Sequence, residues 1–482
     1  MSMRTLALPV LAASVVLSLS ACDPTNPAAQ PADPGTAQAA PTLAPAGNPA
    51  VTLVTPAADR TTSATPSAHP IASGTPKASA TPSPSATPTV TPVTPDLKLD
   101  SYNQQTGKAV LAAADNGKGI PSPSSTAAVT AAVQTGQLID SPPSAAAPHG
   151  ALLAITAVKP AGDGKVQVDT RPATISELLG QTWANIKTAL DPHKIQVTPR
   201  LKDLKTTYVP NPHGGNGSAS AALELDANDT VPLPGGAKAT LSGSLELDPS
   251  VVFSYQGAHG ILVPEQAKVG FDLGAHANWH LTAGLTGSTG PVRIPVATLT
   301  ATPTVMVGDL PVVITLNLTV YAEVSADGNV SVDVTQSVDG DWAIHADYTK
   351  AAGWTTATDP ISTRITPVKA TFAGTADVRS GLAAEGSVAL YDAVGVKATV
   401  EPYLRAAVQG SVSVDSSGAE PSIDGSGGLY GGLDVEGAVM ARIAILGTPL
   451  FEKDLPFKAY HDEWPIVAGS YRNAAPSTTP TS

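Results

Sequence analysis

The sequence predicts a mainly β protein with long antiparallel strands, arranged in curved sheets or in a large β-sandwich. Two observations predict this fold class. First, apolar and polar residues alternate with a period of two over much of residues 219–445, as expected of strands with one buried and one solvated face. Second, only 4% of the residues are aromatic, and small residues often fill the apolar positions, which lets sheets curve strongly or approach closely. The glycines at such positions are Gly374, Gly386, Gly410, Gly431 and Gly437.

The longest alternation covers residues 269–285 and predicts one long strand or a bent pair of strands. Its apolar face carries Val269, Phe271, Leu273, Ala275, Ala277, Trp279, Leu281, Ala283 and Leu285. A second alternation over residues 314–324 precedes a turn signal, Asp-Gly-Asn at residues 327–329, and a returning alternation over residues 330–334. These residues predict a hairpin. Further strands are expected within residues 368–378, 382–390, 406–414 and 429–445.

Two more hairpins are predicted nearer the start of the body. Residues 151–158 and 165–169 flank a Gly-Asp-Gly turn signal. The other hairpin turns at residues 234–236 and places two Leu-Glu-Leu segments, residues 223–225 and 245–247, opposite each other.

One short amphipathic helix is expected at about residues 174–190. Thr174 and Glu177 have the spacing of a capping box, and Asp191-Pro192 ends the helical pattern. We expect its apolar stripe to face a core, and a groove on a partner protein is the alternative. The stripe, with Trp183 near it, consists of Ile175, Leu178, Leu179, Ile186 and Leu190.

The first residues have the features of a secretory signal peptide. Arg4 lies near the start, and the apolar stretch over residues 6–19 is shorter than a membrane span. The stretch ends in Leu-Ser-Ala-Cys at residues 19–22, which resembles the lipobox of bacterial lipoproteins. This resemblance implies cleavage before Cys22 and a lipid on its sulfur. Cys22 is the only cysteine of the chain, so no internal disulfide and no thiolate metal site is expected.

Composition divides the rest of the chain. The segment before the body is rich in Pro, Ala, Thr and Ser and has no apolar period, so we expect a disordered spacer with much polyproline II. The predicted segments are a signal peptide (1–21), a lipid-anchored tether (22–98), a small mixed β region with the helix (99–213), a large antiparallel β domain (214–470) and a disordered tail (471–482).

Four stretches of the body resemble segments of large, uncharacterised β-rich surface proteins of bacteria. They are PHGALLAITAV at 148–158, TRPATISELL at 170–179, ALYDAVGVKATVEPYLRA at 389–406 and GGLYGGLDVEG at 427–437. The resemblance implies an extracellular β architecture. It brings no activity and no site residue.

Charge and motifs narrow the chemistry. The formal net charge is -13, which argues against a nucleic-acid partner because such a partner needs a basic footprint. The chain contains no Gly-x-Ser-x-Gly elbow, no His-Glu-x-x-His zinc helix and no phosphate-binding Gly-x-x-x-x-Gly-Lys loop. We therefore predict no catalytic residue and no cofactor.

Two polar groupings contain residue types that bind metal ions. Asp327, Asn329 and Asp333 cluster near the predicted turn and are candidate calcium ligands, with ordinary turn chemistry as the alternative. His276 and His280 share the polar face of one predicted strand. They would lie about 13 Å apart there, too far to share a metal, so we expect a solvated face.

Two further groupings contain or adjoin tryptophan residues. Asp462 and Glu463 are adjacent, so a strand would send them to opposite faces, which argues against an acid–base pair. Trp342, Tyr348 and Trp354 could form a stacking surface for carbohydrate, but packing within the fold is the favoured interpretation.

The sequence thus predicts a non-catalytic cell-surface lipoprotein that displays a β-rich domain for ligand binding, adhesion or envelope structure. It would be exported and anchored through lipidated Cys22 to the outer face of the cytoplasmic membrane, with the body in the cell wall or at the cell surface. The expected partners are the membrane and a glycan, cell-wall or lipid ligand. The alternatives are a carrier of a lipid or other apolar ligand between curved sheets, and a hydrolase acting on envelope carbohydrate or ester.

Overall fold

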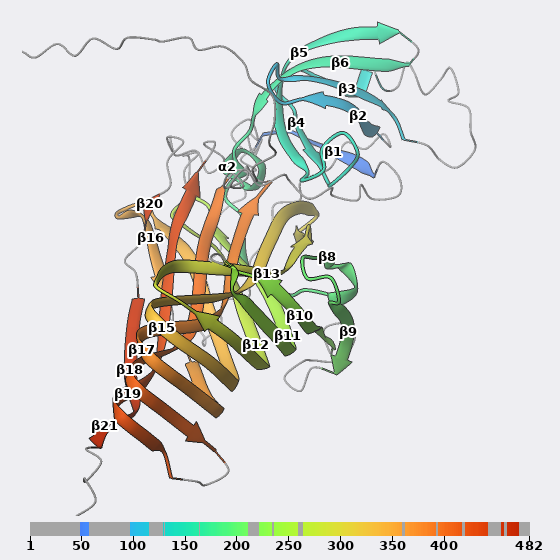
Figure 1. The fold of residues 1–482 in the computed structure, drawn as a ribbon. Helices are drawn as coiled ribbons and strands as arrows, with labels where there is room; N and C mark the ends of the chain where they lie inside the picture. Colours follow the sequence, from blue (N-terminus) through green and yellow to red (C-terminus); the bar gives the residue numbers. More distant parts are fainter. Residues whose placement is uncertain are drawn as a thin grey trace, which may run out of the picture. The chain divides into compact units, whose positions relative to one another are not determined.

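The fold is mainly β, as predicted, and antiparallel pairing joins its strands (Figure 1). The signal peptide, Cys22, most of the predicted tether and residues 472–482 lie outside the described residues. The computed structural model describes residues 49–56, 97–114, 129, 131–162, 164–210, 221–233, 236–258, 264–358, 362–391, 394–416, 420–441, 455–456 and 460–471.

Six strands form a small closed barrel in the order β1-β2-β3-β6-β5-β4. Their bounds are β1 (Ala50–Val54), β2 (Leu97–Asn103), β3 (Lys108–Ala113), β4 (Leu138–Ser141), β5 (Ala151–Gly162) and β6 (Lys165–Pro172). Alternate apolar side chains such as Leu97, Leu111, Ile139 and Val166 fill its interior. The predicted hairpin of β5 and β6 is confirmed.

The predicted boundary of the tether is wrong, because β1 lies inside residues 22–98. Val51, Leu53 and Val54 are buried, and β1 pairs with β2 on one side and β4 on the other. The apolar residues of this strand are too few to be recognised within a Pro- and Ala-rich segment, and only their pairing with distant strands makes them part of the barrel.

The predicted helix is shorter than expected. The capping box is confirmed, since Thr174 Oγ1 accepts from the amide of Glu177 and Glu177 Oε2 accepts from the amide of Thr174. Helix α2 (Ile175–Leu179) then ends at Gly180, which has a φ of 59°. Residues beyond it form β7 (Trp183–Ala189), because pairing with β11 provides main-chain hydrogen bonds that outweigh the helical pattern. No helix among the described residues is long and apolar enough to cross a membrane.

A second, 15-stranded sheet contains β7 and all later strands, and its main path is β9-β10-β11-β12-β15-β17-β18-β19-β20. The predicted boundary at residue 213 is therefore wrong, because β7 to β9 already belong to this sheet. The remaining elements are the 3-10 helix η2 (Pro192–Lys194) and β8 (Gln196–Pro199), β9 (Lys205–Pro210), β10 (Ala221–Pro232), β11 (Lys238–Gln256), β12 (Gln266–Leu285), β13 (Ser288–Ala301), β14 (Thr304–Val307), β15 (Leu310–Thr349), β16 (Gly353–Thr358), β17 (Ser362–Leu390), β18 (Val394–Asp415), β19 (Ser422–Ala441), β20 (Leu455–Pro456) and β21 (Tyr460–Tyr471).

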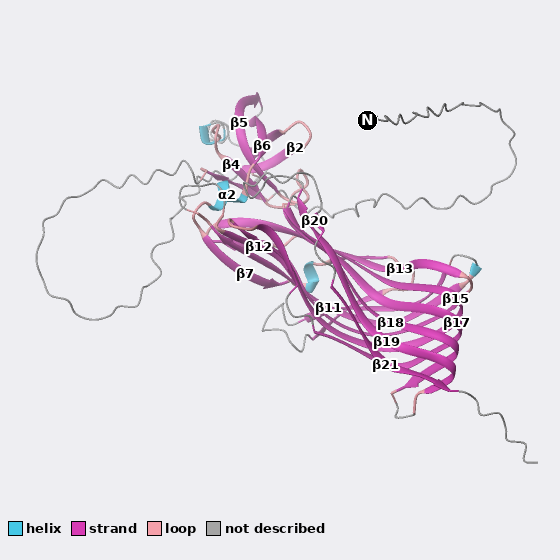
Figure 2. Cartoon of the chain, turned by 90° about the vertical axis from the view of Figure 1, so that its left-hand side faces the viewer, coloured by secondary structure: helices cyan, strands magenta, loops and turns pink. Residues whose placement is uncertain are grey.

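Several long strands were predicted correctly. The alternation over residues 269–285 lies within β12, and most of its apolar side chains are buried. The Leu-Glu-Leu hairpin has the expected register, with Leu223 opposite Leu247 and Leu225 opposite Leu245. Figure 2 shows these long strands side by side across the sheet.

The predicted turn at residues 327–329 is wrong, because β15 continues through it for 40 residues. One edge of β15 pairs first with β13 and then with β12, and the other edge pairs with β17 over the same region. Gly328 has a φ of 128°, and a Cβ there would lie 2.2 Å from Thr375 O. This glycine therefore allows close approach within a continuous strand, and does not reverse the chain.

The curvature of the sheet brings two of its parts together over one apolar core. Phe271 on β12 and Gly386 on β17 are separated by β15 in the sheet, yet a Cβ at Gly386 would lie 2.6 Å from Phe271 Cζ. The predicted use of an apolar-face glycine for close approach is thus seen at Gly386. The even-numbered side chains of β15, such as Leu316 and Val332, face this core along nearly the whole strand.

Candidate functional site on the outer face of the large sheet

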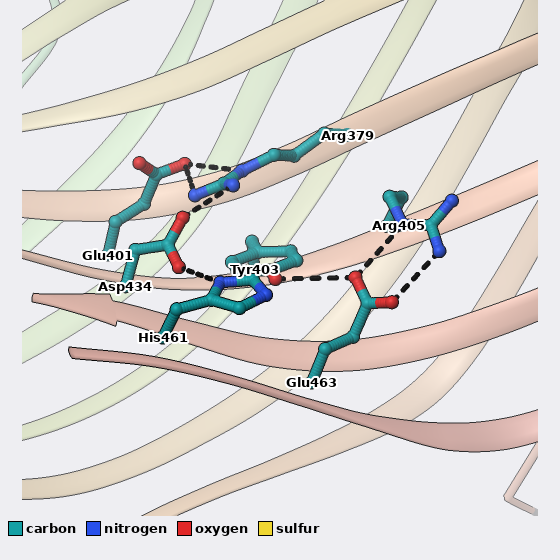
Figure 3. Close-up of polar contacts among 7 residues, drawn as sticks. All are labelled: Arg379, Glu401, Tyr403, Arg405, Asp434, His461 and Glu463. Atoms are coloured by element: carbon teal, nitrogen blue, oxygen red, sulfur yellow. Dashed lines mark hydrogen bonds and ion pairs between the residues drawn. The ribbon is translucent and has the colours of Figure 1, made fainter. Parts of the chain in front are cut away.

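The face of the large sheet opposite the core carries a group of paired charges, which we call the arginine network (Figure 3). It consists of Arg379, Glu401, Tyr403, Arg405, Asp434, His461 and Glu463. These residues come from β17, β18, β19 and β21. The strand register places Asp434 between Glu401 and His461, and Gly432 between Tyr403 and Glu463, so residues distant in sequence become neighbours.

Arg379 lies at the centre of one half of the arginine network. Its Nε and Nη2 both bind Glu401 Oε1, at 3.0 and 2.9 Å, and its Nη1 lies 2.6 Å from Asp434 Oδ2. The guanidinium carbon lies 3.6 Å from the centroid of the Tyr403 ring, which is a cation–π contact. One arginine thus joins three strands through charge and stacking.

Gly432 provides the space for Tyr403. A Cβ at residue 432 would lie 2.2 Å from Tyr403 Cζ, so only glycine lets the ring lie flat across β19. The Tyr403 hydroxyl donates to Glu463 Oε2 at 3.3 Å, and the side chain is almost completely buried. The ring therefore connects the two halves of the arginine network.

Arg405 lies at the centre of the other half. Its Nε and Nη2 form a bidentate pair with Glu463, at 2.9 and 2.8 Å, and its Nη1 donates to Asp377 Oδ2 at 2.8 Å. Bidentate geometry of this kind is the strongest form of ion pair available to arginine. His461 Nδ1 lies 2.5 Å from Asp434 Oδ1 and extends the network to the first residues of β21.

The pKa values of the two glutamates in the arginine network are shifted in opposite directions. Burial raises the pKa of Glu401 to about 7, although Arg379 acts against this rise. Hydrogen bonds from Arg405 hold the pKa of Glu463 below its ordinary value. One carboxyl therefore changes charge near neutral pH while its neighbour stays ionised, a difference that is typical of functional sites and also of structural ion-pair networks.

Similar pairs continue the polar surface toward the middle of the sheet. Arg293 on β13 donates to Glu323 on β15 at 2.9 Å and lies over the ring of Tyr321, with 4.6 Å to its centroid. Lys397 on β18 lies 2.5 Å from Glu385 on β17. The outer face thus carries cross-strand charge pairs from β13 to β21.

The structure separates the candidate calcium ligands. Asp327, Asn329 and Asp333 lie along the one strand β15, so Asp327 and Asp333 are about 20 Å apart at the usual rise per residue. Asn329 Oδ1 accepts from the amide of Gly287 at 2.9 Å, and Asp333 Oδ1 lies 2.8 Å from His280 Nε2. Within the described part of the chain, no group of three or more His, Cys, Asp or Glu residues could hold a metal ion.

The aromatic candidates pack within the fold. Trp342 is buried and donates from Nε1 to Thr363 Oγ1 at 2.8 Å. The Tyr348 and Trp354 rings lie 5.4 Å apart, and Tyr348 is buried. This agrees with the packing interpretation and gives no exposed stacking surface at these three residues.

Asp462 and Glu463 point to opposite faces of β21, as expected of neighbours on a strand. Glu463 belongs to the arginine network, whereas Asp462 is exposed and lies opposite Leu433 in the register. Glu401, Tyr403 and Arg405 were missed as site residues. These polar side chains alternate along one strand, which was a signal of a shared face. The side chains that they bind lie on other strands.

A groove on the outer face was also missed, and we call it the Trp183 groove. It has a volume of about 690 Å³ and is lined by Trp183, Asn185, Lys187, Gln256, Gln266 and Lys268, among others. The register aligns Trp183 with Gln256 and Gln266, and Asn185 with Ser254 and Lys268. The predicted helix explains why the groove was missed, because a helix would place Trp183 beside its apolar stripe.

The inner face carries two neighbouring polar side chains without a hydrogen-bond partner among the described residues. Gln336 on β15 is fully buried, and neither atom of its amide has a hydrogen-bond partner among the described residues. Trp279 lies directly opposite it on β12, and Trp279 Nε1 also lacks a described partner. Such groups are usually satisfied by protein, water or a ligand.

Comparison of the chain with protein-family models, with curated proteins and with solved structures found no match.

Proposed function

We propose that the chain is a non-catalytic, lipid-anchored cell-surface protein that displays the large sheet for ligand binding, adhesion or envelope structure. The observation that supports this best is the outer face of the sheet. There, charged and aromatic side chains of four strands bind one another, as the arginine network, and form a broad polar surface of fixed geometry. Rigid elements are suitable for presenting a binding surface.

The sequence before the body supports the location. The lipobox-like sequence at residues 19–22 provides a cysteine for lipidation, and two acyl chains are enough for stable anchoring. Residues 23–48, which precede β1, are rich in Pro and Ala, a composition typical of an extended spacer. Such a spacer would hold the sheet clear of the membrane.

Replacement of Cys22 by Ala is expected to abolish membrane association, because the sulfur that accepts the lipid is lost. Cell fractionation with an antibody against the body measures this, with labelled palmitate as a second readout. Ser20→Ala is the matched control, since it keeps a small residue beside the cleavage site and should stay in the membrane fraction. A Cys22→Ala protein that still sediments with membranes would contradict the anchoring.

A second candidate function is the transport of an amphiphilic ligand with a small polar group, and the unpartnered Gln336 and Trp279 favour it. An unsatisfied buried polar group costs about 1–3 kcal/mol. A ligand ester or hydroxyl that reached both groups would remove this cost.

Native mass spectrometry of the purified full chain tests the carrier function. A carrier should retain a lipid-sized mass in addition to the anchor, and Gln336→Leu should lose that mass while keeping the fold. A wild-type protein that carries no additional mass would exclude the carrier function and leave the display function as proposed.

A further inference from the structure

We propose that the Trp183 groove binds a neutral oligosaccharide. This inference rests on the proposed display function and names the class of ligand that the displayed sheet would take.

Trp183 is placed where an aromatic ring stabilises the fold little. Its side chain is 69% exposed, which is the highest value among the exposed large apolar side chains of the described residues. The other tryptophans within the described residues, Trp279, Trp342, Trp354 and Trp464, belong to the core or pack against it. A large, rigid ring presented to solvent at a groove offers a flat surface on which the C–H face of a pyranose can stack.

The side chains beside Trp183 are suited to hydroxyl groups. Gln256 and Gln266 follow it across the sheet in one row, and Asn185 lies two residues along β7 on the same face. All three are exposed, and each amide offers both donors and an acceptor. Sugar hydroxyls likewise donate and accept, so a ring stacked on Trp183 would find complementary partners on either side.

The charges of the groove balance one another. Lys187 pairs with Asp272, and Lys268 lies 3.5 Å from Asp347 and 3.0 Å from His345 Nε2. A polyanion would therefore meet Asp272, and a polycation would meet the two lysines. A neutral polar ligand meets neither penalty, and the groove volume of about 690 Å³ is within the range of small-molecule sites.

The size of the groove favours more than one sugar ring. Trp183 and Lys187 are about 13 Å apart along β7, and the lining residues extend across β7, β11 and β12 at about 4.8 Å per strand. A single ring would cover only the Trp183 end. We therefore expect affinity to rise from a monosaccharide to a tetrasaccharide.

The test is isothermal titration calorimetry of the detergent-solubilised full chain with cellotetraose, maltotetraose and chitotetraose. At least one of these probes should bind. Trp183→Ala should lower its affinity about tenfold or more without changing the melting temperature, and Trp183→Phe should recover part of it. Tyr460→Ala, which removes an exposed aromatic ring on β21, is the matched control and should bind as the wild type does.

Either of two results would overturn the glycan proposal: no binding of any tetrasaccharide, or equal affinity of the wild type and Trp183→Ala. A pull-down with isolated envelopes separates a protein ligand from a glycan ligand. Retention on protease-treated envelopes supports a glycan, and loss of retention after protease treatment assigns the groove to a protein and overturns the proposal. Fractionation of Cys22→Ala reports on anchoring independently, so a failure of the groove is distinct from a failure of the display function.

Discussion

Arg379→Met is expected to lower the free energy of unfolding by roughly 3 kcal/mol, the lower part of the range for breaking a largely buried ion pair. The substitution removes the hydrogen bonds to Glu401, the ion pair with Asp434 and the cation–π contact with Tyr403. Methionine keeps most of the side-chain volume, so the loss in the free energy of unfolding measures the contribution of charge and stacking. Urea denaturation of the full chain at pH 8 measures it.

The pH dependence and a matched control identify the cause of this loss. Without Arg379, the pKa of Glu401 should rise further above about 7, so the deficit should shrink at pH 5, where Glu401 is neutral in both proteins. Adding Glu401→Gln should recover much of the loss at pH 8. Lys397→Met breaks a more exposed pair with Glu385 and should cost at most about 1 kcal/mol. Equal losses for Arg379→Met and Lys397→Met would contradict a stabilising role of the arginine network.

Asp140 is expected to make the protein less stable as the pH rises from about 5 to 8. It lies on β4 of the barrel, is fully buried, and its carboxyl is 2.9 Å from the hydroxyl of Tyr391, which follows β17. The same hydroxyl lies 3.0 Å from Pro311 O. A phenol has one proton for these two oxygens, so both contacts are satisfied when Asp140 is protonated and donates to Tyr391 Oη, while Tyr391 donates to Pro311 O.

Burial raises the pKa of Asp140 from its ordinary 3.8 to about 8, although the hydrogen bond with Tyr391 acts against this rise. The folded protein then holds a proton that the unfolded chain has already lost between about pH 4 and 8. Stability therefore falls as pH rises through this range, by at most about 1.4 kcal/mol per pH unit for this one group. Glu401 acts in the same direction up to about pH 7, whereas Glu177 and Glu463, whose pKa values are lowered, affect stability only in more acidic solution.

Denaturation midpoints of the full chain at half-unit steps from pH 5 to 8 measure this slope. Asp140→Asn stays uncharged at every pH and should flatten most of it. Asp100→Asn, which removes an exposed carboxyl on β2 of the same barrel, should leave the slope unchanged. An unaltered slope in Asp140→Asn would show that another group carries the dependence.

Much of the fold could be predicted because burial of one face imposes a period of two whatever the partner strand is. This is why β12 and the hairpin of β10 and β11 were located correctly. The turn at residues 327–329 was predicted wrongly because the residues Asp-Gly-Asn are compatible both with a turn and with a strand that contains an irregular glycine. The strand forms because β13 pairs with one edge of β15 and β17 pairs with the other edge, and this pairing is not local.

The candidate sites were harder to predict than the strands. Arg379 and Glu463 are separated by more than eighty residues, and only the register of β17, β18, β19 and β21 brings them into one network. Trp183 was hidden for a different reason. Residues 183–189 are compatible with both a helical stripe and a strand, and the choice depends on the unpaired edge that β11 offers. Long-range pairing thus decides both the network and the groove.

The path of the large sheet from β9 to β19 follows the order of its strands along the chain, which bears on how the sheet can assemble. Each main strand pairs with the one made just before it, so the sheet can grow from its amino-terminal side during synthesis. The long free edge of β19 then stays open until β21 pairs with it. Nascent or truncated chains would expose this long edge to other chains and would be the species most prone to aggregate.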